Sequence, residues 1–356
     1  MTLLLQDQEI RSLFDMEDAI KAMREAFQEH ARGTTANQTR NVYTIGSSTQ
    51  DLNYISNIIC GASSDKSMAI ARIGSNLVWK GPKGEGSATR REYRPKKPRD
   101  MSLIFCYSLE TGELEAIMQN VHLSDIRVGA TTALAIDHLS RKDSNTLGIL
   151  GSGPQARVSL EGILKVRPIK KAKVYSPNEE RRTSFAQRMT DEFGIDVIPA
   201  KNTKEAIRDV DILSSNTNTL SQPVFEGSML EPGQTIVTIS NSDPVAFRAE
   251  ADEQVFVRSD LIVINHKAAV FADRQIEMLH PIEKKMMTWD KIKELSEVVS
   301  GQTPGRQNEE EIIYYKNNTG MAIQWAVPTA IVLERAKEKG IGRELPSEWF
   351  FTDLSN

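Results

Sequence analysis

The hydrophobic positions of the first third of the chain follow a strand-like pattern. From Asn41 to Met118 the apolar runs are short and rich in β-branched or aromatic residues: NVYTI, NYISNII, SMAIARI, MSLIFCYSL and LEAIM. The turn ETGE between the last two runs predicts a hairpin. Before them, Asp15 to Gly33 has the pattern of an amphipathic helix, which Asp15 can cap with Asp18 three residues on. An α+β region with an antiparallel or mixed sheet is expected here.

The pattern changes from about Ser144. Short, continuously apolar runs now recur, and helical segments such as ERRTSFAQRMTDEFG separate most of them. The runs are TLGILGSG, KAKVYS, IDVIPA, VDILSSN, TIVTIS and LIVIN. Buried strands that alternate with helices predict a parallel, doubly wound sheet. Helices are also expected at Leu123 to His138 and at Gly320 to Gly340, the second with a kink at Pro328.

The predicted architecture is therefore α/β with two domains. A doubly wound Rossmann-type nucleotide domain, residues 126–320, is expected as an insert in an α+β substrate and dimerisation domain. The pieces of that second domain are residues 1–125 and 321–356.

The segment TLGILGSGPQARVSLEGI joins the first strand of the parallel sheet to a helix. Gly151 permits the tight turn, Gly153 lets backbone amides approach a pyrophosphate, and Ala156 is the small residue where the helix crosses the sheet. A glycine-rich packing turn is the alternative. The predicted cofactor-binding residues are Gly151, Ser152, Gly153, Pro154, Gln155, Ser176, Asn178, Arg181 and Asn216.

The end of the second strand bears on the choice of cofactor. After KAKVYS an acidic residue would bind the ribose hydroxyls of NAD. The sequence instead has Ser176, Pro177 and Asn178, followed by Arg181 and Arg182. A hydroxyl, an amide and guanidinium groups suit a 2′-phosphate, which favours NADP over NAD. The alternative is that the two arginines belong to a solvated helix face.

Composition excludes several classes. The chain has 356 residues, 39% of them hydrophobic and 26% charged, with a net charge of −4, so nothing indicates nucleic-acid binding. The first residues lack the features of a signal peptide, and no apolar run is long enough to span a membrane. Cys60 and Cys106 are far apart and the histidines are scattered, so neither a metal site nor a disulfide framework is expected. A cytoplasmic protein is the expectation.

Four motifs, in order, resemble the ornithine cyclodeaminase/μ-crystallin family: LSDIRVGATTALA, LGILGSGPQA, TISNSDP and NNTGMAIQ. The resemblance covers nearly the whole chain. It implies a dimer whose subunits have a substrate domain and a Rossmann domain. It also implies an NAD(P)-dependent hydride transfer at the carbon that bears an amine or imine.

The resemblance implies roles for three residues. Arg127 matches the arginine that binds the substrate carboxylate, and a planar guanidinium can do so with two parallel bonds. Arg40 matches a second arginine of the pocket. Asp243 matches the catalytic aspartate, which could hold the amine or relay a proton. The alternatives are a surface ion pair for Arg40, a salt bridge for Arg127 and a turn-forming role for Asp243 before Pro244. His122 is expected to be structural.

The departures from the family are informative. Arg72 stands where the family usually has a lysine, unless Lys80 supplies the amine. A guanidinium does not exchange protons near neutrality, so Arg72 is expected to bind substrate and polarise the acceptor. Together, Arg40, Arg72 and Arg127 suit two carboxylates, or one carboxylate and a carbonyl oxygen. Trp325, where many members have aspartate, could close the pocket, but dimer packing is the expectation.

The basic segment from Lys80 to Arg99 is interpreted as a loop, either a lid or a solvated surface. Three functions remain open from sequence. The first is an NAD(P)-dependent imine reductase or amino-acid dehydrogenase acting on a small amino, imino or 2-oxo acid. The second is a cyclodeaminase that releases ammonia with bound NAD. The third is a binding protein without turnover.

Overall fold

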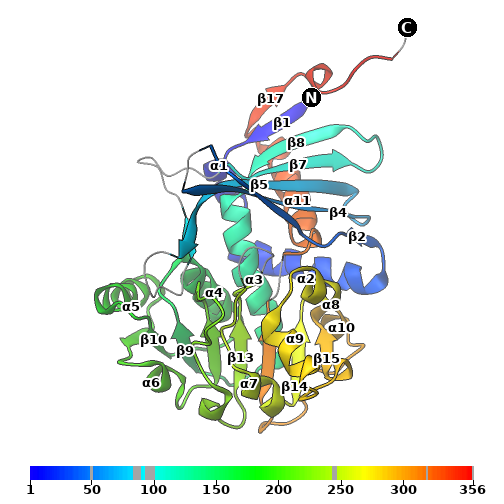
Figure 1. Cartoon of the computed structure of the whole chain (residues 1–356). Helices are drawn as coiled ribbons and strands as arrows, with labels where there is room; N and C mark the ends of the chain where they lie inside the picture. Colours follow the sequence, from blue (N-terminus) through cyan, green and yellow to red (C-terminus); the bar gives the residue numbers. More distant parts are fainter. Residues whose placement is uncertain (49–50, 83–89, 93–100, 243–246, 318–319, 355–356) are drawn as a thin grey trace. The chain divides into compact units, whose positions relative to one another are not determined.

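The computed structural model describes the chain except residues 49–50, 83–89, 93–100, 243–246, 318–319 and 355–356. Two compact units divide the chain (Figure 1). Unit 1 contains residues 1–80, 92–127 and 320–356, and unit 2 contains residues 81–91 and 128–319. The larger unit is thus an insertion between segments of the smaller one.

Unit 1 is built on a mixed sheet. Its strands lie in the order β17 (Arg343–Leu345), β1 (Thr2–Leu5), β8 (Leu114–Gln119), β7 (Leu103–Ser108), β5 (Met68–Pro82), β4 (Leu52–Ser63) and β2 (Thr35–Asn37). Off this path, β3 (Asn41–Gly46) pairs with β4, and β6 (Arg90–Glu92) pairs with β5. The predicted hairpin is confirmed, because β7 and β8 are adjacent and antiparallel.

Helices cover one face of this sheet. They are α1 (Asp7–Leu13), α2 (Met16–Arg32) and α11 (Ile323–Lys339), and α11 packs on α2 and β4 (Figure 1). The predicted capping of α2 is confirmed, since Asp15 accepts a hydrogen bond from the Asp18 amide. Gly33 ends the helix in the left-handed conformation. Pro328 lies inside α11. A short 3-10 helix, η3 (Ser347–Trp349), follows β17.

Register decides which side chains face the helices. Ile59 of β4 lies opposite Arg72 of β5, which in turn lies opposite Ile104 of β7. Ile59 and Ile104 are buried. Because side chains alternate along a strand, Arg72 shares their face, whereas its neighbour Ile73 points to the other face and is 37% exposed.

Unit 2 is built on a sheet whose pairings are all parallel among the described residues. Its strands lie in the order β11 (Asp196–Pro199), β10 (Lys171–Tyr175), β9 (Thr146–Leu150), β12 (Ile212–Ser215), β13 (Thr235–Thr238), β16 (Ile313–Lys316), β14 (Leu261–Ile264) and β15 (Ile292–Glu294). Strand order reverses between β9 and β12, as in doubly wound nucleotide-binding sheets.

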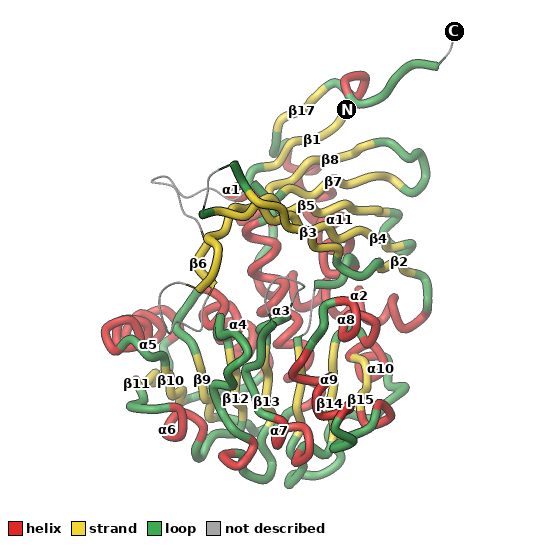
Figure 2. The backbone as a smooth tube through the Cα atoms, in the orientation of Figure 1, coloured by secondary structure: helices red, strands yellow, loops and turns green. Residues whose placement is uncertain are grey.

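Helices flank the sheet of unit 2 (Figure 2). They are α4 (Pro154–Val166), α5 (Glu179–Phe193), α6 (Thr203–Ile207), α7 (Glu253–Arg258), α8 (Lys267–Ala272), α9 (Ile276–Glu283) and α10 (Leu295–Val299), with the 3-10 turns η1 (Gly227–Met229) and η2 (Trp289–Lys291). The core between the layers includes Leu213, Ile236 and Phe256, and Phe256 meets Tyr314 edge-on at 4.9 Å between ring centroids. Helix α3 (Val121–Leu139) belongs to unit 1 up to Arg127 and continues into unit 2.

The structure confirms the α/β fold class and the strands expected at residues 146–150, 171–175, 196–199, 212–215, 235–238 and 261–264. Two strands of the parallel sheet, β15 and β16, were not predicted. The interpretation of Lys80 to Arg99 as a loop is wrong in part, because β5 continues to Pro82 and β6 spans Arg90–Glu92. The rest of that segment lies outside the described residues. No helix in the described part of the chain is long and apolar enough to cross a membrane.

Candidate active site

The turn after β9 has the geometry of a phosphate loop. Gly151 has φ of +106°, and a Cβ at this position would stand 2.4 Å from the backbone oxygen of Asn216. Only glycine therefore fits. Gly153 is the N-cap of α4, where a Cβ would meet no atom within 4 Å, and Pro154 occupies the first turn of the helix. Open space in front of a helix N-terminus lets an anionic group reach the backbone and the positive end of the helix dipole.

This loop opens onto a cavity of about 700 Å³ in unit 2, a size typical of cofactor sites. The cavity collects all the residues predicted to bind the cofactor: Gly151, Ser152, Gly153, Pro154, Gln155, Ser176, Asn178, Arg181 and Asn216. Their shared location fits a dinucleotide. Their individual roles remain predictions.

Arg181 and Arg182, which were predicted together after the end of β10, have different surroundings in the structure. Asn178 caps α5 by accepting a hydrogen bond from the Arg181 amide, and Arg181 lines the cavity. Arg182 instead donates to the backbone oxygen of Ser176 at 3.2 Å and lies 5.7 Å from the Tyr175 ring. Arg182 therefore supports the strand end. Ser176 also lies 2.9 Å from the hydroxyl of Ser152, which ties the strand end to the phosphate loop.

Sequence reasoning missed part of the lining. Thr217 and Asn218 follow β12, and Ile239 follows β13. Ile239 stands directly after the buried run TIVT, and Thr217 and Asn218 come within three residues of the buried run ILSS, at the carboxyl ends of parallel strands where ligands of such sheets bind. This position in the sequence could have identified them as residues of the cofactor site. Thr203 and Val224 also line the cavity and carried no comparable signal, and the remaining lining residues are Leu150, Tyr175 and Pro177.

A cluster of polar and aromatic side chains in unit 1 holds two of the predicted substrate residues. The Arg127 guanidinium lies over the Trp325 ring, with 4.5 Å from Cζ to the ring centroid, and donates to Oε1 of Gln324 at 3.2 Å. Arg72 approaches the same ring, with its Cζ at 5.8 Å. Gly320 is essential to this packing, because a Cβ there would stand 2.5 Å from the indole.

Arg72 has its own supports on the sheet. Its guanidinium donates to Oδ1 of Asn57 on β4, and its second terminal nitrogen lies 3.5 Å from the Ser102 hydroxyl. Trp325 is fixed in turn, because its indole N–H donates to Oδ1 of Asn120 at 2.8 Å. Trp325 is 1% exposed within the single chain. The expectation that it serves dimer packing is therefore wrong, because its ring is already enclosed.

Arg40 is half-buried and directly precedes β3. The first residue of β3, Asn41, pairs with Ile58, and the next residue of β4, Ile59, pairs with Arg72. The backbones of Arg40 and Arg72 therefore lie level with each other on either side of β4. This placement is compatible with one substrate site for both arginines, which remains a prediction.

Two other predicted residues have different outcomes. Asp243 lies outside the described residues. Its neighbour Ser242 is buried and exchanges hydrogen bonds with the backbone of Arg248. His122 is structural, as expected, because its Nε2 lies 2.8 Å from the backbone oxygen of Phe14.

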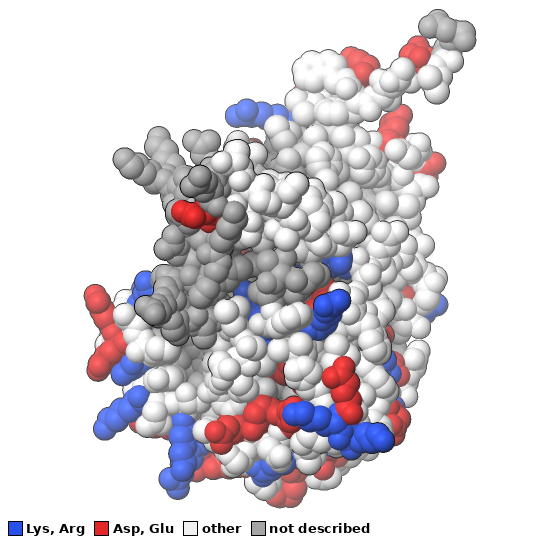
Figure 3. Space-filling view, in the orientation of Figure 1, with Lys and Arg blue, Asp and Glu red and all other residues white. Residues whose placement is uncertain are grey.

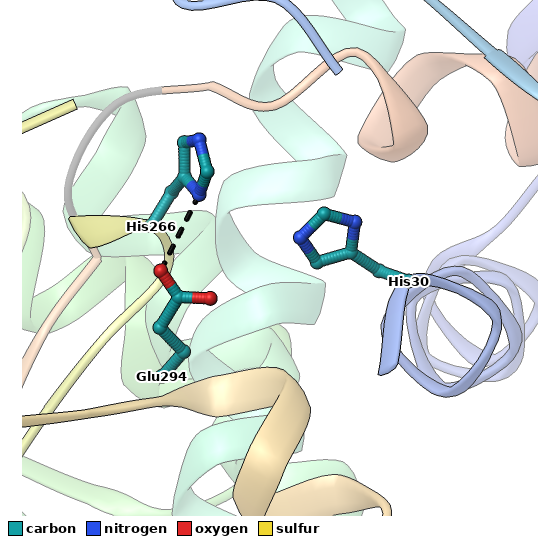
Figure 4. A group of neighbouring side chains, drawn as sticks. All are labelled: His30, His266 and Glu294. Atoms are coloured by element: carbon teal, nitrogen blue, oxygen red, sulfur yellow. Dashed lines mark ion pairs between the residues drawn. The ribbon is translucent and has the colours of Figure 1, made fainter. Parts of the chain in front are cut away.

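Histidines elsewhere have local partners. In unit 2, His266 follows β14 and its Nδ1 lies 3.4 Å from Oε1 of Glu294 at the end of β15 (Figure 4). In unit 1, Nδ1 of His30, which projects from α2, lies 2.7 Å from the Thr35 hydroxyl.

A parallel sheet with a glycine turn and a helix N-terminus at its switch point defines a Rossmann-type dinucleotide-binding unit. The model of the ornithine cyclodeaminase/mu-crystallin family matches residues 1–340, so the chain belongs to this family. A Delta(1)-pyrroline-2-carboxylate reductase of Bacillus thuringiensis subsp. konkukian is 30% identical over 244 residues, 68% of this chain and 73% of the relative.

Two solved structures share the whole architecture. The Thermococcus litoralis Delta(1)-pyrroline-2-carboxylate reductase, in complex with NADH and L-proline, is 26% identical with a TM-score of 0.83, covering 97% of this chain and 100% of that one. An archaeal alanine dehydrogenase dimer with bound NAD is 25% identical with a TM-score of 0.82, covering 98% and 99%. The predicted family, the fold and an oxidoreductase that uses a nicotinamide cofactor are confirmed.

Proposed function

We propose that this protein reduces the C=N bond of a small 2-imino acid to give an amino acid, with NAD(P)H as the hydride donor. The imino acid is either cyclic or formed from a 2-oxo acid and ammonia. The relatives named above act in this class of chemistry. The observation that carries the proposal is the convergence of Arg72 and Arg127 on the ring of Trp325. Two fixed guanidiniums provide anion binding without a proton-exchanging amine.

Each residue has a separate task in this proposal. Arg127 holds the α-carboxylate of the substrate through two parallel hydrogen bonds, which fixes the position of the α-carbon. Arg72 binds a second substrate oxygen, and where the imine forms from a 2-oxo acid it stabilises the negative charge that develops on the carbonyl oxygen as ammonia adds. Asp243 moves the proton to or from the nitrogen. When bound in unit 2, the nicotinamide supplies the hydride.

The arginines also favour a particular substrate. Arg40 lies level with Arg72 on the sheet, so up to three guanidiniums would be available to one substrate. We propose that the preferred substrate carries two carboxylates, or one carboxylate and a further oxygen.

We propose NADP as the preferred cofactor. A second cavity of about 390 Å³ adjoins the phosphate loop and shares Ser152, Asn178 and Arg181 with the first. Its remaining lining is Glu180, Ser184 and Arg188. Two guanidiniums and two hydroxyls suit a phosphate group, and the single carboxylate of Glu180 offsets only part of that charge.

The test of this preference is the ratio of the Kd values for NADPH and NADH, followed by fluorescence of the reduced cofactor. In Arg181→Ala/Arg188→Ala the affinity for NADPH should fall at least tenfold and that for NADH by less than twofold. Arg157→Ala is the control, because Arg157 pairs with Glu161 and Glu192 and lines neither cavity. Equal losses for both cofactors would contradict the phosphate role.

We further propose that two copies associate through the open face of the sheet in unit 1. Ile73, Tyr107 and Tyr43 on this face are 37%, 37% and 49% exposed. Register places Ile58, Leu103 and Phe105 beside them on the same face. Charged side chains are sparse over these strands in the space-filling view (Figure 3). A contiguous apolar face of this kind favours a protein partner.

Association is tested by light scattering during gel filtration. Wild type should have twice the mass of the chain, and Ile73→Arg should have the mass of one chain. Lys339→Ala, on the opposite side of unit 1 at the end of α11, is the control and should leave the mass unchanged. A wild-type mass of one chain at micromolar concentration would contradict the proposal.

The activity is tested by the near-ultraviolet absorbance of NADPH and NADH. The panel contains cyclic imino acids, and monocarboxylic and dicarboxylic 2-oxo acids with ammonia or methylamine. Sustained consumption of either cofactor, fastest with a dicarboxylic acceptor, is the expected result. No consumption, with ammonia released from ornithine or lysine, would instead assign a cyclodeaminase.

A further inference from the structure

A buried carboxylate stands behind the cofactor cavity of unit 2. Glu250 has no exposed surface, yet its side chain accepts five hydrogen bonds. Oε1 accepts from the Ser215 hydroxyl at 2.7 Å and from the amide and hydroxyl of Thr217 at 2.9 and 2.7 Å. Oε2 accepts from the amides of Ile239 and Ser240 at 2.9 and 2.7 Å. Hydrogen bonds to a buried charged acceptor are among the strongest in proteins.

These five bonds join the ends of two neighbouring strands. Ser215 is the last residue of β12, and Thr217 follows it. Ile239 and Ser240 follow β13. Thr217 and Ile239 line the cavity, whereas Glu250 does not. One carboxylate therefore fixes the backbone of two segments that form the cavity wall, without reaching the cavity itself.

Glu250 is itself held in place by a second buried carboxylate. Oε1 of Glu277 accepts from the amides of Glu250 and Ala251 at 3.0 and 2.7 Å. Oε2 of Glu277 pairs with the ammonium of Lys316, which also donates to the backbone oxygen of Ser240 at 2.6 Å. Lys316 and Glu250 have no exposed surface, and Glu277 has only 4%. Moving these charged groups out of water costs desolvation free energy, which a packed apolar cluster in the same place would not cost. The network is present despite that cost.

The position of these segments in the sheet indicates which part of the cofactor they face. In a doubly wound sheet each half of the strand set binds one mononucleotide. Ser176, Asn178 and Arg181 stand beside β9 and β10, in the first half. Thr217 and Ile239 follow β12 and β13, in the second half, which would receive the nicotinamide mononucleotide of a bound cofactor.

We infer that Glu250 is a positioning residue for the nicotinamide half of the cofactor site. Its five accepted hydrogen bonds hold Thr217 and Ile239 in the shape that receives this half. A carboxylate is required because every group that faces it is a donor. A glutamine would present one oxygen and place an NH₂ group against backbone N–H groups. The inference rests on the proposed location of the cofactor in this cavity.

The experiment compares the affinity of Glu250→Gln and wild type for two ligands. NADH or NADPH, whichever wild type binds more tightly, reports on both halves of the site and is followed by its fluorescence. AMP reports on the first half alone and is followed by calorimetry. The Kd of the reduced cofactor should rise about tenfold or more, because one misplaced segment removes at least one contact. The Kd of AMP should stay within about twofold.

Two further variants make the result decisive. Asp252→Asn is the control, because Asp252 accepts from the amides of Gly227 and Val255 and does not line the cavity. Both affinities should be unchanged in this variant. Ser215→Ala removes one bond to Glu250 and should weaken the reduced cofactor about threefold with AMP unaffected. This milder variant also serves if Glu250→Gln does not fold.

The inference is overturned if both ligands weaken in parallel, which would indicate a general loss of structure, or if neither weakens in a folded variant. A wild-type protein that binds AMP and the reduced cofactor with equal affinity would instead contradict the proposed cofactor site.

Discussion

The guanidinium of Arg127 lies over the Trp325 ring, with 4.5 Å between Cζ and the ring centroid, and Arg72 approaches the same ring, with its Cζ at 5.8 Å. The two arginines come from α3 and β5, and the ring comes from α11. A single indole thus orients two cations from different elements. Cation–π contacts of this kind contribute about 0.5–2 kcal/mol each, depending on burial.

Replacing Trp325 should therefore impair substrate binding and leave cofactor binding intact. Trp325→Leu removes the ring and leaves a cavity, so we expect KM for the imino or 2-oxo acid to rise at least tenfold. A loss of about 3 kcal/mol in stability should accompany it. Trp325→Phe keeps an aromatic face and loses only the hydrogen bond to Asn120, so KM should rise about threefold. Steady-state kinetics measure the rise in KM, and NADPH titration shows whether cofactor binding is intact. A substrate KM unchanged in Trp325→Leu would contradict the orienting role.

Arg127→Lys tests bidentate binding. An ammonium keeps the positive charge but not the planar fork that matches a carboxylate. We expect kcat/KM to fall about 100-fold, which corresponds to about 2.7 kcal/mol. Lys142→Arg is a matched control, since Lys142 pairs with Asp137 at the surface of unit 2 and should tolerate the change. A loss below threefold in Arg127→Lys would mean that this arginine does not hold the carboxylate.

Alanine substitutions at the two glycines of the phosphate loop should have different effects on stability and cofactor binding. Gly153→Ala adds a methyl group into open space, so the protein should keep its melting temperature within about 1 °C. Its Kd for the reduced cofactor should nevertheless rise more than tenfold, because that space is where a phosphate group would lie. Gly151→Ala forces a Cβ against Asn216 at positive φ and should lower the melting temperature as well. Calorimetry and fluorescence titration separate the two effects.

The contact between α2 and α11 should make stability depend on acidic pH. Hydrogen bonding to Arg335 lowers the pKa of the Asp18 carboxyl, with Nη2 to Oδ1 at 2.7 Å. A lowered folded-state pKa stabilises the protein above the unfolded value of about 4, and this contribution is lost as the pH falls through the folded value.

Asp18→Asn should therefore destabilise the protein by about 1 kcal/mol at pH 7 and by much less near pH 3. Thermal unfolding at the two pH values measures this difference. Asp7→Asn, which removes an acid paired with exposed Arg11, is the comparison variant. An equal effect of Asp18→Asn at both pH values would contradict the role of its charge.

The two cysteines should differ in reactivity. Burial raises the pKa of the Cys106 thiol to about 12, and its side chain has no exposed surface. Burial also raises the pKa of Cys60, which is only half-buried. Iodoacetamide at pH 8 should therefore label Cys60 slowly and Cys106 only after unfolding, as mass spectrometry would detect. Rapid labelling of Cys106 in the folded protein would show that its strand opens locally.

The parts of the fold that sequence predicted have a local signal. Three local patterns each predict an element within about ten residues: the cap at Asp15, the turn ETGE and the run TLGILGSG. Strand β16 has no such signal. Its residues IYYK follow a long irregular segment, and its last residue, Lys316, resembles a solvated strand end, although it is fully buried. Its partner Glu277 lies on α9, far away in sequence.

The candidate site likewise has a part that the sequence predicts and a part that it does not. The phosphate loop is contiguous, so its residues could be named from spacing alone. The surroundings of Trp325 depend on Asn120 and Arg127, which are some 200 residues away in the chain. No periodicity connects residues at that separation. Glu250 was missed for the same reason, because a glutamate in RAEADEQ gives no indication that five donors surround it.

The place of β16 in the sheet has a consequence for folding on the ribosome. This strand pairs with β13 on one side and β14 on the other, yet both of those emerge earlier in synthesis. Until residue 316 has left the exit tunnel, the facing edges of β13 and β14 remain open to other strands. The nascent chain therefore passes through a period of exposed edges, in which a chaperone would shield it and a premature stop would leave it prone to aggregate.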